Sequence, residues 1–296
     1  MKVIDVQNVF LKYPSAKSDT IRGISFAVQQ GEIFGFLGPS GAGKSTMQKI
    51  LTGTLRNYRG NVRVFDTEMK NRTSDYYENI GVDFEFPNFY SKFTAAENLK
   101  YFASLYSRKP LDPMELLEKV GLRHDADKKV ADYSKGMKMR LGFVRSLLHE
   151  PKLLFLDEPT SGLDPGERVR FRNLLSEFAS HDRIVLISTH IVSDVEYIAT
   201  CNAVMKGGKI QAVGTTEELV TLVNGKVWNG TIPAGQLAEY ENRLQIVNLR
   251  NEADGRISVR YLAEKPGIED SVPAVPRLED LYLWMFPESR FDKEAD

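Results

Sequence analysis

Residues 38–45 read GPSGAGKS, which matches the phosphate-binding pattern G-x-x-x-x-G-K-[S/T]. In such a P-loop, glycines let backbone N–H groups turn toward phosphate oxygens, and the following helix adds its positive end. Lys44 then reaches the β- and γ-phosphates, while Ser45 supplies a hydroxyl for magnesium. The residues expected to hold the nucleotide are Gly38, Pro39, Ser40, Gly41, Ala42, Gly43, Lys44, Ser45 and Thr46. The loop therefore predicts a nucleotide site with Mg²⁺.

Two adjacent carboxylates, Asp157 and Glu158, follow the apolar run Leu153–Leu156. Open α/β sheets place their chemistry at such strand ends. We expect Asp157 to support magnesium and Glu158 to polarise an attacking water. His190 follows a second apolar run, Ile184–Ser188, so it belongs at the same edge and could hydrogen-bond a terminal phosphate. An ordinary polar loop position is the alternative for a lone histidine.

The elements that must position these residues alternate through roughly the first 220 residues. Short β-branched and aromatic runs are separated by helical patterns, which is typical of an α/β fold with a mostly parallel sheet. We expect Val3–Leu11 and Ile24–Val28 to form an antiparallel edge. Ile33–Leu37 is predicted to be a buried strand that leads into the P-loop, and Thr46–Leu51 the helix that follows it.

Helix signals replace strand signals between about residues 87 and 142. Thr94 with Glu97 forms a capping box, and Asp112 before Pro113 marks another helix start. We predict a mostly helical insertion into the α/β core at this position.

The character of the chain changes again after residue 218. Two alternating segments, Ile246–Arg250 and Ile257–Leu262, flank a turn, and Leu278–Met285 carries apolar residues at helical spacing. We therefore expect a nucleotide-binding domain over residues 1–218 and a small α+β accessory region over residues 219–296.

Composition excludes several classes of function. The 39 basic and 40 acidic residues nearly balance, so no global charge favours nucleic acid as a partner. The single cysteine, Cys201, excludes an internal disulfide and a thiolate zinc cluster. No apolar run approaches the roughly eighteen residues that span a bilayer, and the amino terminus lacks a signal-peptide core. We expect a cytoplasmic protein, and any membrane-spanning part would be another chain.

Further motifs follow the P-loop in a fixed order: YSKGM at Tyr133–Met137, LLFLDEP at Leu153–Pro159, SGLD at Ser161–Asp164 and STH at Ser188–His190. Together they resemble the ATP-binding subunits of ABC transporters over about the first 220 residues. The resemblance implies a magnesium-dependent ATPase that packs head to tail with a second ATPase subunit, expected to be an identical copy. Each ATP would lie between the P-loop of one subunit and the signature, Tyr133–Met137, of the other.

The same resemblance assigns further residues. Ser134 and Gly136 would contact the ATP of the partner subunit, and Asp164 would lie at the dimer seam. Tyr13 matches the upstream aromatic that stacks on adenine, although a core or surface tyrosine is the alternative. The segment Asn88–Lys92 is the candidate contact for a short helix of the membrane subunit.

The resemblance also implies partners. It places the chain on the cytoplasmic face of a membrane, bound to a separate transmembrane permease, with no nucleic acid partner. The YSKGM signature, the short length and the C-terminal extension resemble exporter-type subunits.

Two positions depart from the family pattern. The usual signature is L-S-G-G-Q, and Lys135 here could either aid phosphate binding or point to solvent. Glu85 stands where a glutamine normally contacts magnesium and water, which suggests an additional magnesium ligand. A shifted alignment that leaves Glu85 facing solvent is the alternative.

Two other functions remain open at this point. A soluble ABC ATPase of translation or DNA maintenance would carry a second ATPase module or long coiled coils, and this chain shows neither. A regulatory module that holds ATP with weak turnover is opposed by Glu158 and His190.

Overall fold

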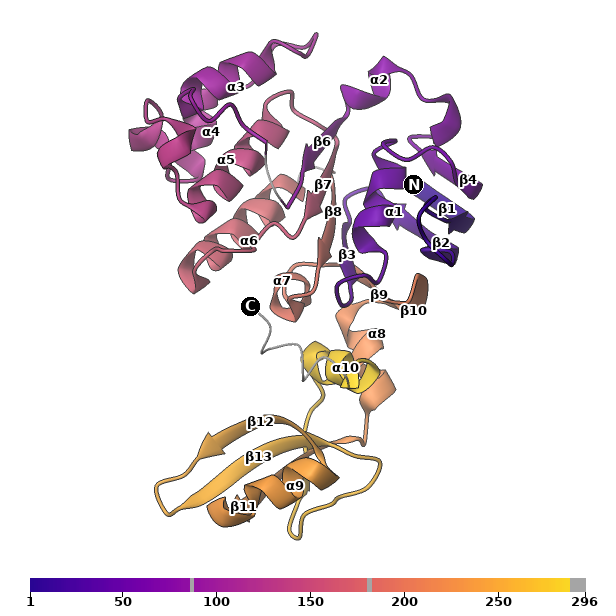
Figure 1. The fold of residues 1–296 in the computed structure, drawn as a ribbon, viewed down its shortest axis with the longest axis vertical. Helices are drawn as coiled ribbons and strands as arrows, with labels where there is room; N and C mark the ends of the chain where they lie inside the picture. The colour runs from indigo at the N-terminus through magenta and orange to yellow at the C-terminus, as the bar shows by residue number, and fades with distance from the viewer. Residues whose placement is uncertain (86–87, 180–182, 288–296) are drawn as a thin grey trace. The chain divides into compact units, whose positions relative to one another are not determined.

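The structure is a computed structural model that describes residues 1–85, 88–179 and 183–287. The chain forms two compact units, Met1–Val213 and Gly214–Asp296. The boundary expected after residue 218 falls inside helix α8 (Thr216–Val220), which begins with a capping box between Thr215 and Glu218. Both units are visible in Figure 1.

A six-stranded sheet forms the centre of the first unit, in the order β10-β9-β3-β8-β7-β6. Its strands are β3 (Ile33–Leu37), β6 (Ile80–Asp83), β7 (Leu153–Asp157), β8 (Ile184–Thr189), β9 (Cys201–Lys206) and β10 (Lys209–Gly214). Neighbours from β9 to β6 pair in parallel. Every residue of β3, β7 and β8 is buried, as expected for strands covered on both faces. The predicted α/β fold with a mostly parallel sheet is confirmed.

A second, antiparallel sheet lies beside it in the order β2-β1-β4-β5. Its strands are β1 (Lys2–Leu11), β2 (Ile21–Gln29), β4 (Arg59–Val64) and β5 (Thr67–Glu68). The predicted antiparallel pairing of β1 with β2 is confirmed, but these strands form a sheet of their own because β1 pairs on its other side with β4. Phe26 of β2 stacks on Phe34 of β3, so the two sheets share one core.

Helices connect the strands of the first unit. Helices α1 (Lys44–Leu51), α6 (Pro165–Ala179) and α7 (Val192–Glu196) follow strands of the parallel sheet, and α2 (Ser74–Tyr77) precedes β6. The insertion contains α3 (Ala95–Ala103), α4 (Pro113–Lys119) and α5 (Lys135–Leu147). These three helices gather on one side of the six-stranded sheet, opposite the antiparallel sheet (Figure 1).

The helix starts predicted in the insertion are present. Thr94 and Glu97 form the capping box of α3, and the Asp112 side chain accepts from the Met114 N–H at the start of α4. The predicted start of the insertion near residue 87 lies outside the described residues, and α5 continues to Leu147, beyond the predicted end at residue 142.

The second unit is α+β. Its sheet, in the order β12-β13-β11-β14, consists of β11 (Val227–Pro233), β12 (Gln245–Asn251), β13 (Arg256–Leu262) and β14 (Val272–Pro273). Tyr240 of helix α9 (Leu237–Arg243) packs against a core around Val259 and Tyr261. Helix α10 (Leu278–Met285) packs against α8. Across the described ranges of both units, no helix is long and apolar enough to cross a membrane.

Candidate active site

The P-loop connects β3 to α1, as the sequence predicts, and its backbone requires glycine. Gly41 and Gly43 adopt φ angles of 78° and 106°, in the left-handed region that suits glycine. A Cβ atom at Gly38 would lie 2.3 Å from the carbonyl oxygen of Met205. The Lys44 Nζ donates to the carbonyl oxygens of Gly38, at 2.7 Å, and Pro39, at 3.2 Å. The loop thus curves around its own lysine, with Ser40 and Gly41 exposed at its tip.

Asp157 lies at the carboxyl end of β7 and is 8% exposed. Its Oδ1 accepts from the Ser45 Oγ at 3.1 Å and also from the Ser188 hydroxyl of β8. Gln48 of α1 donates to the Leu156 carbonyl oxygen at 2.8 Å and to Ser188 Oγ at 3.1 Å. The structure therefore brings Ser45 and Asp157 together, and Gln48, which the sequence did not single out, fixes α1 against both strands.

Glu158 is the next residue and adopts a left-handed φ of 49°. Such a conformation is costly for a non-glycine residue and is typical of functional sites. Its Oε1 lies 3.6 Å from Lys44 Nζ, and its Oε2 lies 2.8 Å from His190 Nδ1. Thr189 Oγ1 donates to Oε2 at 3.3 Å. The strained backbone aims the carboxylate between the P-loop lysine and His190.

These contacts set the protonation of the site. Burial raises the pKa of Glu158, but hydrogen bonds and charge from His190, with the Lys44 charge, outweigh burial and hold the pKa below 4.5. In return, the hydrogen bond to Glu158 raises the pKa of His190 above 6.5. Burial lowers the pKa of Lys44 below 10.5, against the carboxylates around it. Glu158 is therefore ionised at neutral pH, which suits a group that polarises water.

Asp194 is a supporting residue that the sequence did not reveal. Its Oδ2 accepts from Thr189 Oγ1 at 3.2 Å and from the Thr160 hydroxyl, and the residue is 2% exposed. Burial raises its pKa. Asp194 thus joins the loop after Glu158 to the end of β8. No motif spacing marks an aspartate in α7 for this role.

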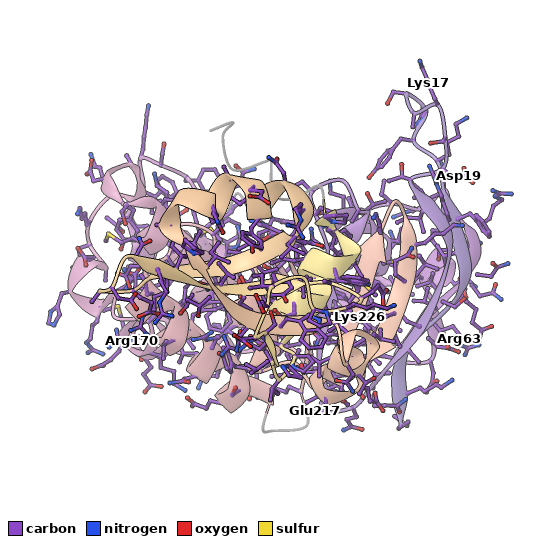
Figure 2. All side chains as sticks on the ribbon, turned by 90° about the horizontal axis from the view of Figure 1, so that it is seen from below. Lys17, Asp19, Arg63, Arg170, Glu217 and Lys226 are labelled. Atoms are coloured by element: carbon purple, nitrogen blue, oxygen red, sulfur yellow. The ribbon has the colours of Figure 1, made fainter. Side chains whose placement is uncertain are left out.

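Tyr13 follows β1. It lies at the base of the loop that carries Lys17 and Asp19 and projects from the antiparallel sheet (Figure 2). Its hydroxyl lies 3.3 Å from Thr46 Oγ1, and its ring is partly buried against the shared core. The predicted adenine-stacking residue is therefore next to the start of α1.

Glu85 lines a cleft of about 790 Å³ together with Ser45 and Asp157, so the three oxygen-bearing side chains predicted for magnesium share one cavity. The described part of the chain holds no cluster of three or more histidine, cysteine or acidic residues that could bind a metal by itself. Magnesium usually takes one or two carboxylates plus phosphate oxygens and waters. The residues present fit a magnesium ion that arrives with a nucleotide.

Ser134 and Gly136 of the signature lie elsewhere. Ser134 is the N-cap of α5, where its Oγ accepts from the Met137 N–H at 3.2 Å and keeps its proton to donate. Between residues 133–137 and residues 38–46, all described, the structure contains no hydrogen bond or ion pair. In the view of Figure 1, strands β6–β8 separate α5 from α1.

Known proteins resemble this chain in both sequence and fold. The family model described as "ABC transporter" matches residues 21–161. The fluoroquinolones export ATP-binding protein of Mycobacterium tuberculosis is 47% identical over 218 residues, covering 74% of this chain and 72% of that protein. This chain belongs to the ABC transporter family. It binds ATP and is an ABC-type ATPase that powers transport across a membrane.

Two further matches show how far the likeness to ABC proteins extends. A solved ATP-binding subunit of an ABC transporter superposes with a TM-score of 0.67 at 26% identity, covering 74% of this chain and 92% of that one. The Nod factor export ATP-binding protein I of Rhizobium meliloti is 32% identical over 289 residues, covering 90% of this chain and 86% of that protein. That second match therefore extends past Val213 into the second unit.

Lys135, the first departure of this ABC subunit from the usual signature, is exposed and contacts a residue of its own chain. Its Nζ donates to Ser161 Oγ at 3.1 Å, in the loop that follows Glu158. The signature and this loop are therefore in direct contact within one chain.

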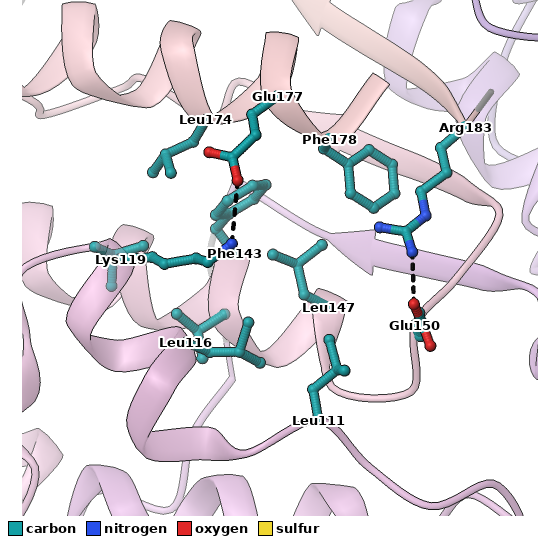
Figure 3. A pocket seen from close by; sticks show the side chains of 12 residues that line it. Leu111, Leu116, Lys119, Phe143, Leu147, Glu150, Leu174, Glu177, Phe178 and Arg183 are labelled. Atoms are coloured by element: carbon teal, nitrogen blue, oxygen red, sulfur yellow. Dashed lines mark hydrogen bonds and ion pairs between the residues drawn. The ribbon is translucent and has the colours of Figure 1, made fainter. Parts of the chain in front are cut away.

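A second cavity of the ABC domain, of about 350 Å³, lies between α4, α5 and α6 (Figure 3). Two ion pairs, Lys119–Glu177 at 3.2 Å and Arg183–Glu150 at 2.7 Å, lie among its lining side chains. The apolar lining includes Leu111, Leu116, Phe143, Leu147, Leu174 and Phe178. None of the residues that line this cavity belongs to the P-loop.

Proposed function

We propose that this ABC ATPase is an exporter subunit that binds Mg·ATP at its P-loop, beside the cleft of about 790 Å³ that Ser45, Glu85 and Asp157 line, pairs head to tail with a second copy, and drives a separate transmembrane permease. The observation that carries the proposal is the position of Glu158. Its carboxylate is buried, ionised and held between Lys44 and His190, beside the Ser45–Asp157 pair.

Each residue of the site takes one role in this proposal. The P-loop amides and Lys44 hold the phosphates, and Ser45 with Asp157 holds Mg²⁺, to which Glu85 adds a further carboxylate. When bound, the ion neutralises charge that develops on the phosphate oxygens. Glu158 polarises the attacking water and accepts its proton. His190 fixes the Glu158 carboxylate through Nδ1 and contacts the γ-phosphate. Tyr13 stacks on adenine.

A second copy completes the site. Ser134 keeps a hydroxyl proton to donate, and Gly136 lies in the first turn of a helix whose positive end favours an anion. Because neither residue contacts the P-loop of its own chain, the nucleotide of a partner is the anion that fits them.

Exposed aromatic rings support the permease contact. Tyr90, Phe93 and Tyr101 are 48%, 42% and 41% exposed. Tyr90 lies 5.3 Å from Phe93 and 5.0 Å from Tyr101, measured between ring centroids. Exposed, clustered aromatics are typical of interface anchors. They lie in and beside Asn88–Lys92, so this surface would receive a helix of the permease at the cytoplasmic face of the membrane.

Export as the direction of transport rests on the relatives. Their names cite export of fluoroquinolones and of Nod factor, and a third relative, from Bacillus licheniformis, is a bacitracin transport protein at 37% identity. Two of these names cite export, which supports that direction of transport. Because the three cargoes differ in chemistry, they do not indicate which substrate is transported.

Turnover of the purified full-length chain tests the nucleotide half of the proposal. We expect ATP hydrolysis that needs Mg²⁺, disappears with EDTA, and falls in Lys44→Ala because the phosphates lose their cation. A wild-type chain that binds ATP without magnesium-dependent turnover would contradict the proposal and favour a regulatory module.

Capture from membranes tests the permease half. The double variant Tyr90→Ala/Tyr101→Ala should lose a copurifying membrane protein while keeping its ATPase rate. Tyr197→Ala is the matched control, because Tyr197 is 73% exposed and lies in another part of the unit. Equal capture by both variants would remove this surface from the interface.

A further inference from the structure

The first residue of α5 carries a charge that the helix itself disfavours. Lys135 places a cation in the first turn, where the helix dipole favours anions, and no acidic residue accompanies it. Its ammonium instead reaches away from the helix and donates to Ser161 Oγ at 3.1 Å. The contact therefore needs an explanation other than helix stability.

Gly162 provides the space for this lysine. It adopts a φ of 83°, and a Cβ atom there would meet the Cδ of Lys135 at 2.7 Å and its Cε at 3.1 Å. The aliphatic part of Lys135 thus lies flat against the backbone of Gly162, while its charged end bonds Ser161. The side chain has two fixed points on one loop.

That loop, Glu158–Asp164, connects the residue that polarises water with the residue expected at the dimer seam. The Ser161 N–H donates to the Glu158 carbonyl oxygen at 3.1 Å. At its other end, the Asp164 N–H donates to Glu167 Oε2 at 3.2 Å, and Arg140 of α5 bonds Glu167 Oε1 at 3.0 Å. Helix α5 therefore contacts the middle of the loop through Lys135 and reaches its Asp164 end through Arg140 and Glu167.

We propose that Lys135 is a positioning residue that fixes the loop Glu158–Asp164 to the first turn of α5, so that a partner's nucleotide at Ser134 and Gly136 adjusts Glu158 within the same chain. The inference rests on the proposed head-to-tail dimer. Phosphate bound at the start of α5 displaces that turn, and the loop moves with it because Lys135 and Arg140 connect the two. Coupling between two sites needs such a continuous physical link.

Steady-state kinetics of the full chain test the link. Lys135→Met and Ser161→Ala should each lower kcat by about three- to fivefold, as expected for an exposed charged hydrogen bond, with KM for ATP changed less than about twofold. The double variant should be no slower than either single variant, because both remove the same interaction. Lys138→Met, a change of the same type one turn further along α5, should match wild type.

Two kinetic outcomes would overturn the inference. A raised KM in Lys135→Met with a silent Ser161→Ala would mean that the lysine contacts phosphate. Additive losses in the double variant would mean that the two residues act separately. Lys135→Arg, which keeps a cationic donor, should recover most of the lost kcat.

Amide hydrogen exchange gives a second readout that needs no turnover. The N–H groups of Ser161 and Leu163 donate to the carbonyl oxygens of Glu158 and Thr160, both at 3.1 Å. Lys135→Met and Ser161→Ala should exchange these amides about three- to fivefold faster, while Lys138→Met should not. Unchanged exchange in Lys135→Met would end the inference even in an active enzyme. An inactive wild type with altered exchange in the variant would instead sink only the proposed function.

Discussion

The acid pair after β7 and the signature at the start of α5 satisfy their polar groups in opposite ways. Asp157 and Glu158 are each 8% exposed and are bonded by side chains of their own chain. Ser134 is exposed and keeps a proton to donate. Buried polar groups must find partners within the fold, whereas exposed donors can wait for another molecule. One half of the site is complete in a single chain, and the other is shaped for a second.

The largest expected effect comes from replacing a residue of the acid pair after β7. Glu158→Gln should lower kcat by at least about a hundredfold, because an amide cannot accept the proton of water, while ATP binding persists. Nucleotide binding and turnover should be measured side by side. Glu150→Gln is a matched control, since Glu150 also has a left-handed φ, of 54°, and lines the second cavity, which contains no P-loop residue. Full hydrolysis by Glu158→Gln would refute the assignment.

Ser134→Ala removes the hydroxyl donor of the signature. It should lower kcat about tenfold through the lost phosphate contact, and weaken α5 by only about 1 kcal/mol through the lost cap. Mixing this variant with Glu158→Gln sharpens the comparison. In a head-to-tail dimer of the two, one site receives both defects and the other receives neither.

Random pairing of equal amounts makes half of the dimers mixed, and each mixed dimer has one intact site out of two. The mixture should therefore regain up to about a quarter of wild-type turnover. A mixture no more active than the average of its two components would mean that Ser134 and Glu158 of one chain act on the same nucleotide, which contradicts the head-to-tail arrangement.

Glu85→Gln tests whether Glu85 belongs to the magnesium site with Ser45 and Asp157, and a smaller effect is expected. Loss of one carboxylate from the cleft should raise the magnesium concentration needed for half-maximal turnover by a few-fold, since a neutral amide is a weaker ligand. A magnesium titration at saturating ATP measures this shift. If both the titration and the rate match wild type, Glu85 is not a ligand.

The smallest effect concerns pH and the His190–Glu158 pair. Because Glu158 raises the pKa of His190 above 6.5, the stability from the pair is fully present below that pH and is lost as pH rises through the raised value. Because the pKa of Glu158 is lowered, its share of the stability is fully present above pH 4.5 and is lost as pH falls through the lowered value. His190 is half exposed, so solvent keeps the contribution below about 1 kcal/mol.

Thermal unfolding of His190→Ala checks this window. Its deficit relative to wild type should be largest near pH 6 and shrink toward pH 9, about three units higher. His124→Ala, at an exposed histidine outside the cleft, should show no such trend. A deficit that grows with pH would reverse the assigned protonation.

The sequence predicted those features that neighbouring residues determine. The P-loop, the buried strands, the capping box at Thr94 and the helix start at Asp112 are local patterns, and the structure has them where they were expected. Helix α9 was not foreseen, because none of its residues is buried and no apolar period marks it.

Long-range partners were also beyond the sequence. The side chains of Asp194, Gln48 and Lys135 acquire their meaning from residues far along the chain, such as Thr160, Leu156 and Ser161. An exposed lysine at a helix start shows no sign in the sequence of the loop against which it will lie.

The carbonyl contacts of Lys44 change what an affinity for ATP means. Its ammonium already bonds Gly38 and Pro39 and lies near Glu158, so the loop is preorganised before any phosphate arrives. Nucleotide binding is therefore an exchange of hydrogen-bond partners, and its free energy is the difference between two occupied states. Specificity for a triphosphate then comes from phosphate oxygens that bind the Lys44 ammonium more strongly than the carbonyl oxygens of Gly38 and Pro39 do.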